Sequence, residues 1–157
     1  MDLRMMLKLI VNAGPCGAYI GKSLSSLKEQ TYTDWEAYVT IDPYGDDTFA
    51  KAVQAKGDDE RIKITLNEQR RYSMRNLVQA IARSNAQPED VIVILDGDDW
   101  LYTAKALQII ADTYSDYDCW MTYGSWVSNV AYMPGRLPGY AEDTTDFRRA
   151  EWLATGV

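Results

Sequence analysis

Three aspartates within four residues, Asp96, Asp98 and Asp99, are the side chains in this sequence best suited to bind a metal ion. They follow the apolar run 91–95, whose β-branched residues predict a strand buried on both faces. Carboxylates at such a strand end are costly unless a cation or hydrogen-bond donors accept them. Because α/β proteins bind ligands there, the pattern favours a divalent metal that carries a phosphate ligand. The alternative is a polar turn, with Asp99 as the N-cap of the next element.

The composition restricts both the metal and its partners. The 157-residue chain has no histidine, which excludes a His-ligated zinc site and a Ser–His or Cys–His nucleophile pair within the chain. It has two cysteines, Cys16 and Cys119, which lie far apart in the sequence. Oxygen ligands favour magnesium, manganese or calcium. The net charge of −7 argues against a nucleic-acid partner. The sequence contains no disulfide framework, no evident signal peptide and no membrane-spanning stretch, so we expect a cytoplasmic protein. Association with the inner face of a membrane is an alternative.

The rest of the sequence alternates between strand and helix patterns about four times. The expected strands are residues 6–11, 35–41, 62–66, 91–95 and 119–123. The expected helices carry apolar residues at helical spacing: Ile20, Leu24 and Leu27; a segment from about Asp46–Thr48 to Lys56; Met74, Leu77, Val78 and Ile81 after Ser73; and Leu107, Ile110 and Tyr114 after Thr103. This order predicts an α/β, Rossmann-like fold with a mostly parallel sheet flanked by helices.

The loops after the strands are expected to meet at one edge of this sheet. Asn12, Asp42 and the segment 96–99 each follow a strand, so all three would face one crevice. Aspartates repel a nucleotide diphosphate, but a divalent cation between the two reverses the sign of the interaction. Gly97 lets the backbone turn tightly between two of the aspartates.

Two arginines near the start of a predicted helix could supply the positive charge that this edge needs. Arg71 and Arg75 follow the third expected strand and can donate charge-assisted hydrogen bonds to a phosphate or an acidic sugar. The alternative for each arginine is a solvated or salt-bridged helix residue.

Four segments resemble, in order, motifs of the family 2 glycosyltransferases. Residues 24–42, LSSLKEQTYTDWEAYVTID, are similar to the start of these proteins, and residues 74–76, MRN, look like their Ala-Arg-Asn helix start. Residues 95–101, LDGDDWL, are similar to the L-D-x-D-D-W motif, the DxD signature of the family. Residues 121–125, MTYGS, resemble a TYG segment found in one branch, so the resemblance covers most of residues 7–123.

The resemblance implies a GT-A fold and a glycosyltransferase, typically inverting, that uses a nucleotide-diphosphate sugar, often a UDP-sugar. By the same analogy Asp42 contacts the base, Asp96 lies on the ribose or pyrophosphate side, and Asp98 with Asp96 holds Mn2+ or Mg2+. The acceptor, whether a saccharide, a lipid-linked glycan or a protein, is not identified. The expected nucleotide-sugar site comprises Asn12, Ala13, Asp42, Arg71, Arg75, Asp96, Gly97 and Asp98.

The sequence also departs from the family pattern. The acidic loop begins with a single aspartate, Asp42, followed by Pro43, where the family pattern D-D-G-S-x-D begins with two aspartates. Family catalytic domains continue past the DxD into an acceptor-binding half that supplies the base, and Glu142, Asp143 and Asp146 match no such motif. We therefore expect a single nucleotide-sugar-binding domain over 1–157, with a core over 1–123, an incomplete acceptor-side region over 124–157, and no assigned base.

Other functions stay open at this point. The chain could be a non-catalytic nucleotide-sugar-binding domain, or a fragment that needs a missing half or a partner chain, and an exposed apolar face where that half would pack makes self-association plausible. An aspartate-based phosphohydrolase is disfavoured, because its D-x-D belongs on the first strand. A nicotinamide or flavin enzyme is disfavoured because no G-x-G-x-x-G follows the first strand.

Overall fold

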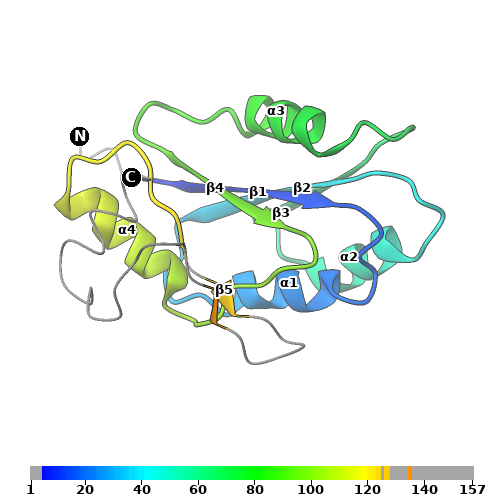
Figure 1. The fold of residues 1–157 in the computed structure, drawn as a ribbon, viewed down its shortest axis with the longest axis horizontal. Coiled ribbons are helices and arrows are strands. Elements are labelled where there is room, and N and C mark those ends of the chain that lie inside the picture. Colours follow the sequence, from blue (N-terminus) through cyan, green and yellow to red (C-terminus); the bar gives the residue numbers. More distant parts are fainter. Residues whose placement is uncertain (1–4, 125, 128–133, 136–157) are drawn as a thin grey trace. The chain divides into compact units, whose positions relative to one another are not determined.

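A computed structural model of the chain describes residues 5–124, 126–127 and 134–135, and divides the chain into two compact units, residues 1–108 and 109–157. The first unit contains a parallel sheet in the order β3-β2-β1-β4 (Figure 1), formed by β1 (Leu7–Ala13), β2 (Trp35–Ile41), β3 (Ile62–Leu66) and β4 (Val91–Asp96). The connecting helices are α1 (Ile20–Lys28), α2 (Thr48–Lys56) and α3 (Ser73–Ser84). Further along the chain follow α4 (Ala106–Asp116) and the antiparallel pair β5 (Trp126–Val127) and β6 (Pro134–Gly135).

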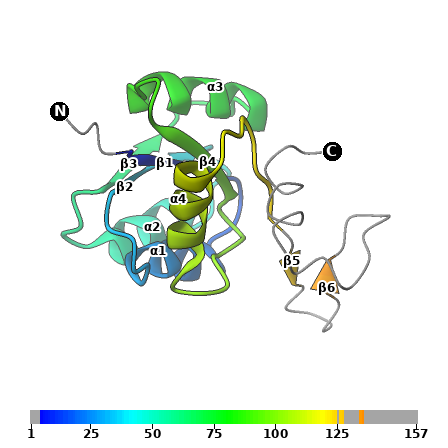
Figure 2. The same ribbon diagram turned by 90° about the vertical axis from the view of Figure 1, so that its left-hand side faces the viewer.

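Helices cover both faces of the sheet, with α3 on one face and α1 and α2 on the other (Figures 1 and 2). On the α3 face, Ile10 and Tyr38 pack against Ala80 of the helix. Neighbouring residues of a strand point to opposite faces, so the alternate set faces α1 and α2. That set is the apolar core of the unit. Its fully buried strand residues are Leu7, Leu9, Val11, Trp35, Ala37, Val39, Ile41 and Ile62. The expected mostly parallel α/β sheet with flanking helices is confirmed.

Three expectations about individual elements are wrong. Residues 119–123 form no strand, and the side chain of Trp120 in this segment is almost fully exposed. β4 is not buried on both faces: among the described strands it pairs only with β1, and Ile94 is 58% exposed. An apolar run cannot distinguish a central strand from an edge strand, because that depends on which neighbours the rest of the chain supplies.

The third error concerns the face that α3 buries. Leu77 and Ile81 pack against the core as expected. Met74 and Val78 were expected on the same buried face but are exposed, while Asn76, Ala80 and Ser84 are buried. Their spacing of four residues places small and polar side chains toward the sheet, where Ala80 meets Ile10 and Tyr38. The small residues allow the helix to lie close to the strands, which apolar periodicity alone does not reveal. None of the helices in the described residues is long and apolar enough to cross a membrane.

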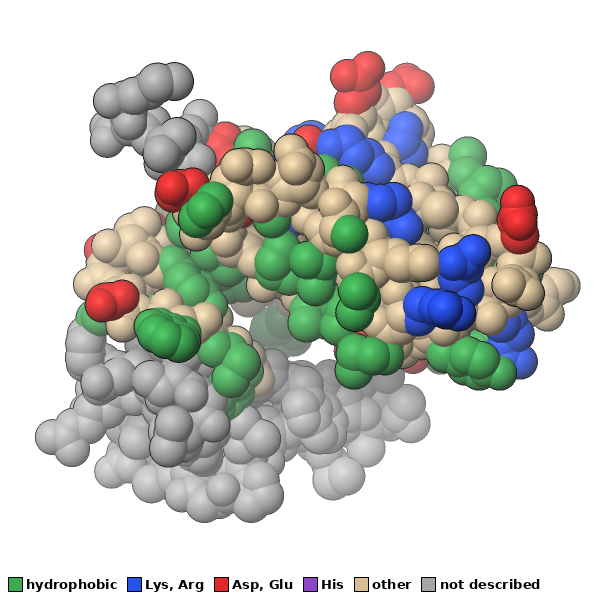
Figure 3. Space-filling model, turned by 90° about the horizontal axis from the view of Figure 1, so that it is seen from above, with side chains coloured by type: hydrophobic (Ala, Val, Ile, Leu, Met, Phe, Trp, Pro, Cys, Tyr) green, Lys and Arg blue, Asp and Glu red, His purple; other side chains and the backbone are tan. Residues whose placement is uncertain are grey.

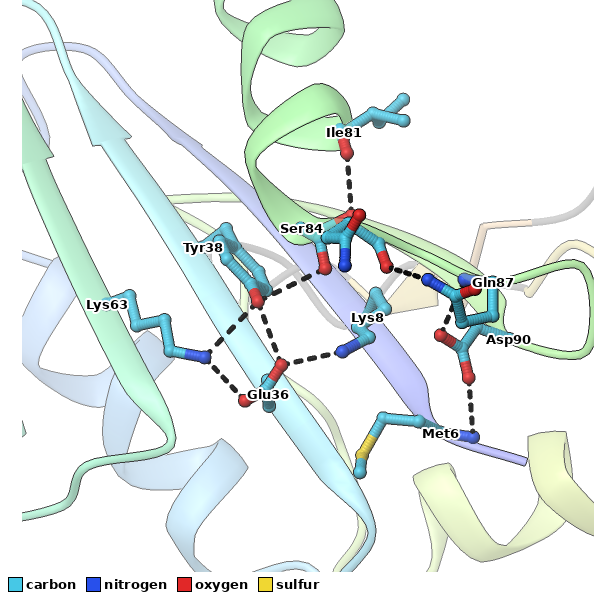
Figure 4. Close-up of polar contacts among 10 residues, drawn as sticks. Met6, Lys8, Glu36, Tyr38, Lys63, Ile81, Ser84, Gln87 and Asp90 are labelled. Carbon is cyan, nitrogen blue, oxygen red and sulfur yellow. Dashed lines mark hydrogen bonds and ion pairs between the residues drawn. The ribbon is translucent and has the colours of Figure 1, made fainter. Parts of the chain in front are cut away.

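A charged network joins the sheet to the end of α3 (Figure 4). Glu36 accepts hydrogen bonds from Lys8 (2.7 Å), Lys63 (2.5 Å) and the Tyr38 hydroxyl (2.8 Å), so β1, β2 and β3 meet at one carboxylate. The Tyr38 hydroxyl also lies 3.3 Å from the Ser84 carbonyl oxygen at the last turn of the helix. Burial alone would raise the pKa of Glu36, but hydrogen bonds from Lys63, Lys8 and Tyr38 lower it from 4.5 to about 2.

Glu36→Gln is expected to lower the free energy of unfolding and to flatten its dependence on pH. A carboxyl group whose pKa is depressed by folding stabilises the protein above its unfolded pKa, and this contribution is lost as the pH falls from 4.5 to about 2. At neutral pH we expect a loss of about 1–2 kcal/mol, after allowance for solvent screening. Chemical denaturation across this pH range measures both effects. Glu68→Gln, at an exposed position, is the control, and an unchanged slope in Glu36→Gln would contradict the role of the network.

Candidate functional site

The carboxyl ends of β1, β2 and β4 bring the predicted site residues together. Asn12 of β1 is the register partner of Asp96 in β4. The backbone amide of Gly97 donates to the Asn12 carbonyl oxygen at 2.7 Å, and the amide of Asp42 donates to the Ala13 carbonyl oxygen at 3.1 Å. The loop after β2 and the aspartate loop (residues 96–99) therefore lie on opposite sides of the end of β1. The expected convergence of these three loops at one sheet edge is present in the structure.

Gly97 lies in direct contact with the end of β1. A Cβ atom at this position would lie 2.9 Å from the Ala13 Cβ and 3.0 Å from both the Asn12 carbonyl oxygen and the Cys16 Sγ. The backbone of Gly97 does not have a positive φ, so close approach is the reason for glycine here. This contact sets the position of the aspartates on either side of it.

The carboxylates of the aspartate loop create a local excess of negative charge. Asp96 and Asp98 are exposed, and in the part of the chain that the structure describes, no lysine or arginine forms an ion pair with either. Burial and the charges of Asp98 and Asp96 raise the pKa of Asp99. Burial and the charge of Asp98 also raise the pKa of the Cys16 thiol to about 11, so this thiol is neutral at physiological pH. Such a site favours a cation.

Asp42 is buried and holds the segment that leads into α3. Its Oδ1 accepts hydrogen bonds from the Asn67 side chain (2.8 Å) and the Arg71 amide (3.0 Å), and its Oδ2 accepts one from the Tyr72 amide (2.9 Å). Burial alone would raise the pKa of Asp42, but these hydrogen bonds, led by the one from Asn67, lower it. Asp42 thus orders the loop that carries Arg71, a role that the sequence did not indicate. Its predicted contact with a base stays a prediction.

Asp42→Asn is expected to lower the free energy of unfolding by about 1–2 kcal/mol at neutral pH, because an amide cannot accept all three hydrogen bonds. The depressed pKa of Asp42 means that its contribution is present at neutral pH and disappears as the pH falls through the folded-state pKa, so parent and variant should converge in acid. Chemical denaturation at several pH values checks this. The control is Asp58→Asn, at an exposed aspartate away from this edge of the sheet. A constant difference between parent and Asp42→Asn at all pH values would contradict this role of the Asp42 carboxylate.

The arginines of this edge differ in their surroundings. Arg75 is exposed on α3, whereas Arg71 is half-buried and its Nε has no hydrogen-bond partner among the described residues. Neither forms an ion pair in that part of the chain. Sequence reasoning missed Arg70, whose guanidinium lies over the Tyr44 ring at 4.1 Å and donates to the Tyr44 hydroxyl at 2.9 Å. Position in a loop at the sheet edge was the only sequence feature that pointed to Arg70 and Tyr44.

The loop after β1 is tied to the loop after β2. The Cys16 amide donates to the Thr48 Oγ1 at 3.0 Å, and Thr48 is fully buried at the first residue of α2. A Cβ on Gly17 would lie 2.0 Å from the Asp47 side chain, so these loops also touch at the next position. The loop from Asn12 through Gly17 is therefore part of the same edge as Asp42.

The described residues contain no complete set of metal ligands. No group of three or more His, Cys, Asp or Glu side chains within them is arranged to hold a metal ion. Asp96 and Asp98 are oxygen donors on one loop, and a cation between them would need further oxygen ligands from elsewhere. A diphosphate can supply such ligands.

Comparisons with known proteins agree with this fold. The sequence matches the family described as Glycosyl transferase family 2 over residues 10–142. No protein of curated function matches it. The structure is similar to S. aureus TarS in complex with UDP-GlcNAc (TM-score 0.67, 20% identity, 83% of this chain and 37% of that chain). It is also similar to TarS in complex with UDP (TM-score 0.70, 19% identity, 83% and 38%).

A third similar structure is the mannosyltransferase PcManGT from Pyrobaculum calidifontis in complex with GDP-Man and Mn2+ (TM-score 0.65, 17% identity, 81% of this chain and 37% of that chain). The chain spans little more than a third of the length of these structures. The expected GT-A-type fold and the family resemblance are both confirmed. Because the family match covers most of its length, the chain belongs to glycosyl transferase family 2.

Proposed function

We propose that the chain binds a nucleotide-diphosphate sugar, and specifically a UDP-sugar, at the loops after β1, β2 and β4. The observation that carries the proposal is the convergence of Asn12, Asp42 and the aspartate loop at the end of β1. Support for the ligand class comes from similar structures, which hold UDP-GlcNAc, UDP and GDP-Man. Support for uridine is the pair of TarS complexes.

A divalent metal, Mn2+ or Mg2+, fits the residues that the aspartate loop offers. Asp98 and Asp96 would hold it, because both carboxylates are exposed and are not paired with a described lysine or arginine. Mg2+ commonly binds to proteins through one or two carboxylates together with substrate phosphates, so two aspartates are sufficient. When bound, the metal would stabilise the charge of the departing nucleotide diphosphate. A similar structure contains Mn2+.

The chain's own polar groups would complete the nucleotide site. The Asn12 Oδ1 is buried without a hydrogen-bond partner among the described residues, so it can accept a hydrogen bond from a ligand hydroxyl or amide. Arg71, with its unpaired Nε, and Arg75 would donate to the diphosphate. Asp42 would position Arg71 through the backbone bond and contact the base through a remaining lone pair.

Sugar transfer would be inverting, with the acceptor hydroxyl displacing the nucleotide from the anomeric carbon. The acceptor is a saccharide, a lipid-linked glycan or a protein. The acidic residues that follow the described core, Glu142, Asp143 and Asp146, lie outside the described residues, and no base is assigned. The single domain over 1–157 and its incomplete acceptor-side region over 124–157 stay predictions, as does the cytoplasmic location.

The second proposed function is nucleotide-sugar binding without catalysis by this chain alone, with a missing half or a partner chain supplying the acceptor side. The observation that favours it is the coverage of the similar structures, of which the chain spans only 37–38%. Self-association through an exposed apolar face belongs to this alternative.

Thermal-shift measurements with UDP, GDP and ADP, each with and without Mn2+, test the proposal. We expect UDP with Mn2+ to raise the melting temperature, and UDP alone to raise it less, because the carboxylates then repel the diphosphate. If no nucleoside diphosphate raises the melting temperature in the presence of metal, the binding proposal is wrong. Hydrolysis of a UDP-sugar or transfer by the chain alone would refute the binding-only alternative.

A further inference from the structure

In the part of the chain that the structure describes, two residues other than glycine have a positive φ, and they flank α3. Asn85, with φ 47° and ψ 41°, is the C-cap of the helix, in the left-handed conformation that asparagine adopts readily. Tyr72, with φ 66° and ψ 160°, lies directly before the helix, in a region of φ and ψ that is essentially restricted to glycine. The conformation of Tyr72 is therefore strained, whereas that of Asn85 has a local reason.

Hydrogen bonds of the backbone hold Tyr72 in this conformation. Its amide donates to the Asp42 Oδ2 at 2.9 Å, and the Arg71 amide donates to the Oδ1 of the same carboxylate at 3.0 Å. The Tyr72 carbonyl oxygen accepts a hydrogen bond from the Asn76 amide at 3.1 Å. A glycine at position 72 would keep all three bonds without strain, because none of them involves the side chain. The backbone therefore does not explain why this residue is a tyrosine.

The ring of Tyr72 contributes little to the packing of the fold. The side chain is 66% exposed, and the Arg70 guanidinium lies over its ring at 5.2 Å from the centroid. Arg70 is fixed in turn by Tyr44, through the ring contact at 4.1 Å and the hydrogen bond to the hydroxyl at 2.9 Å. These contacts restrain the Tyr72 ring and leave most of its surface open. A strained residue with an exposed, restrained ring indicates a contact with a ligand.

Tyr72 also lies beside the residues of the proposed nucleotide site. Asp42 binds its amide, and the Asn12 side chain donates to the Oγ of the next residue, Ser73, at 3.4 Å. The loop after β1, residues 12–17 (NAGPCG), contains no aromatic residue. Figure 3, which views the side of the molecule that carries α3, shows lysine and arginine side chains next to hydrophobic ones, a class that includes tyrosine. An exposed aromatic ring in basic surroundings suits a planar base that carries phosphates.

We propose that the nucleobase of the donor stacks on the ring of Tyr72. This inference rests on the proposed nucleotide-sugar site and adds a residue to it. Asp42 contacts the edge of the base, and Tyr72 covers its face, so one carboxylate both binds the base and fixes the backbone of the residue that stacks on it. Every base has a π face, so stacking adds affinity for any nucleoside diphosphate, while the preference among bases depends on hydrogen bonds.

Calorimetric titration of the full chain with UDP and with methyl diphosphate, each with Mn2+, tests this contact, because methyl diphosphate has no base. Tyr72→Gly removes the ring and relieves the backbone, so the melting temperature should stay equal or rise by a few degrees. Its affinity for UDP should fall about tenfold, and its affinity for methyl diphosphate should not change. Tyr72→Leu keeps a side chain but has no ring, so it should lose as much UDP affinity. Tyr72→Phe keeps the ring and should restore the affinity to within about twofold of the parent.

The matched control is Asn85→Gly, which replaces the residue of positive φ at the opposite end of α3 and should bind UDP as the parent does. The proposal is wrong if Tyr72→Gly and Tyr72→Leu keep the parental affinity for UDP. It is also wrong if they weaken UDP and methyl diphosphate equally, since the effect would then act on the diphosphate through the backbone of Arg71. A parent that binds neither ligand with Mn2+ would contradict the proposed function itself, whereas a parent that binds UDP while the Tyr72 variants do so equally well would contradict only the role of Tyr72.

Discussion

Asp98→Ala is expected to abolish metal-dependent nucleotide binding while the fold stays intact. Asp98 is exposed on the aspartate loop, and no side chain in the described residues forms an ion pair with it, so its removal leaves no buried donor unsatisfied. If Asp98 and Asp96 hold the metal, loss of one of two protein ligands should weaken the affinity for UDP with Mn2+ by at least about 100-fold. Isothermal titration calorimetry with UDP, in the presence and absence of Mn2+, measures the effect.

A second consequence of Asp98→Ala concerns its neighbour. The charge of Asp98 is one cause of the raised pKa of Asp99, so this pKa should fall in the variant. Asp58→Ala, at another exposed aspartate outside the sheet edge, is the control for the loss of one negative charge. If Asp98→Ala retained the Mn2+-dependent affinity of the parent, Asp98 would not be a metal ligand. If Asp58→Ala weakened binding to the same extent, the effect would be one of net charge.

Gly97→Ala is expected to reduce both stability and nucleotide binding. The new methyl group would meet Ala13, the Asn12 carbonyl oxygen and Cys16 at 2.9–3.0 Å, and one of these neighbours is backbone that cannot rotate away. The aspartate loop must therefore move away from the end of β1, which lengthens the 2.7 Å hydrogen bond from the Gly97 amide to Asn12. Overpacking of this kind costs about 1–3 kcal/mol. Displacement of Asp96 and Asp98 should also weaken UDP binding with Mn2+ by at least about tenfold.

The control for this substitution is Gly21→Ala, since a Cβ at Gly21 in α1 meets nothing within 4 Å. Alanine favours a helix over glycine, so this variant should be stabilised by up to about 1 kcal/mol and bind UDP normally. Thermal denaturation and calorimetry on both variants separate a local clash from a general effect of glycine replacement. A Gly97→Ala protein with parental stability and affinity would show that the loop adapts without cost, contrary to the argument from close approach.

The alternation of strand and helix, the parallel sheet and its site edge could all be predicted from the sequence. Trp35–Ile41 and Ile62–Leu66 are strands with the expected bounds, because their alternating apolar side chains have one stable orientation on a sheet. The loops after β1, β2 and β4 converge as expected, because parallel connectivity sends every strand's carboxyl end to one edge. Local pattern and connectivity are thus sufficient for the fold class and for the location of Asn12, Asp42 and the aspartate loop.

What side chains do at that edge depends on contacts between distant segments. Asp42 accepts a hydrogen bond from the Arg71 amide and so orders that backbone. Position 97 must be glycine because the end of β1 leaves no room for a Cβ atom. Neither role follows from residue type or spacing. The exposure of Met74, Val78 and Ile94 depends on which partners the sheet and α3 find, so apolar periodicity assigned these residues to the wrong environment. The sequence by itself determined the elements, their order and the acidic edge, because these rest on local preference and chain direction. Only the tertiary structure decided which hydrogen-bond donors and acceptors pair with one another and which side chains stay exposed to a ligand, because those contacts join residues far apart in the chain.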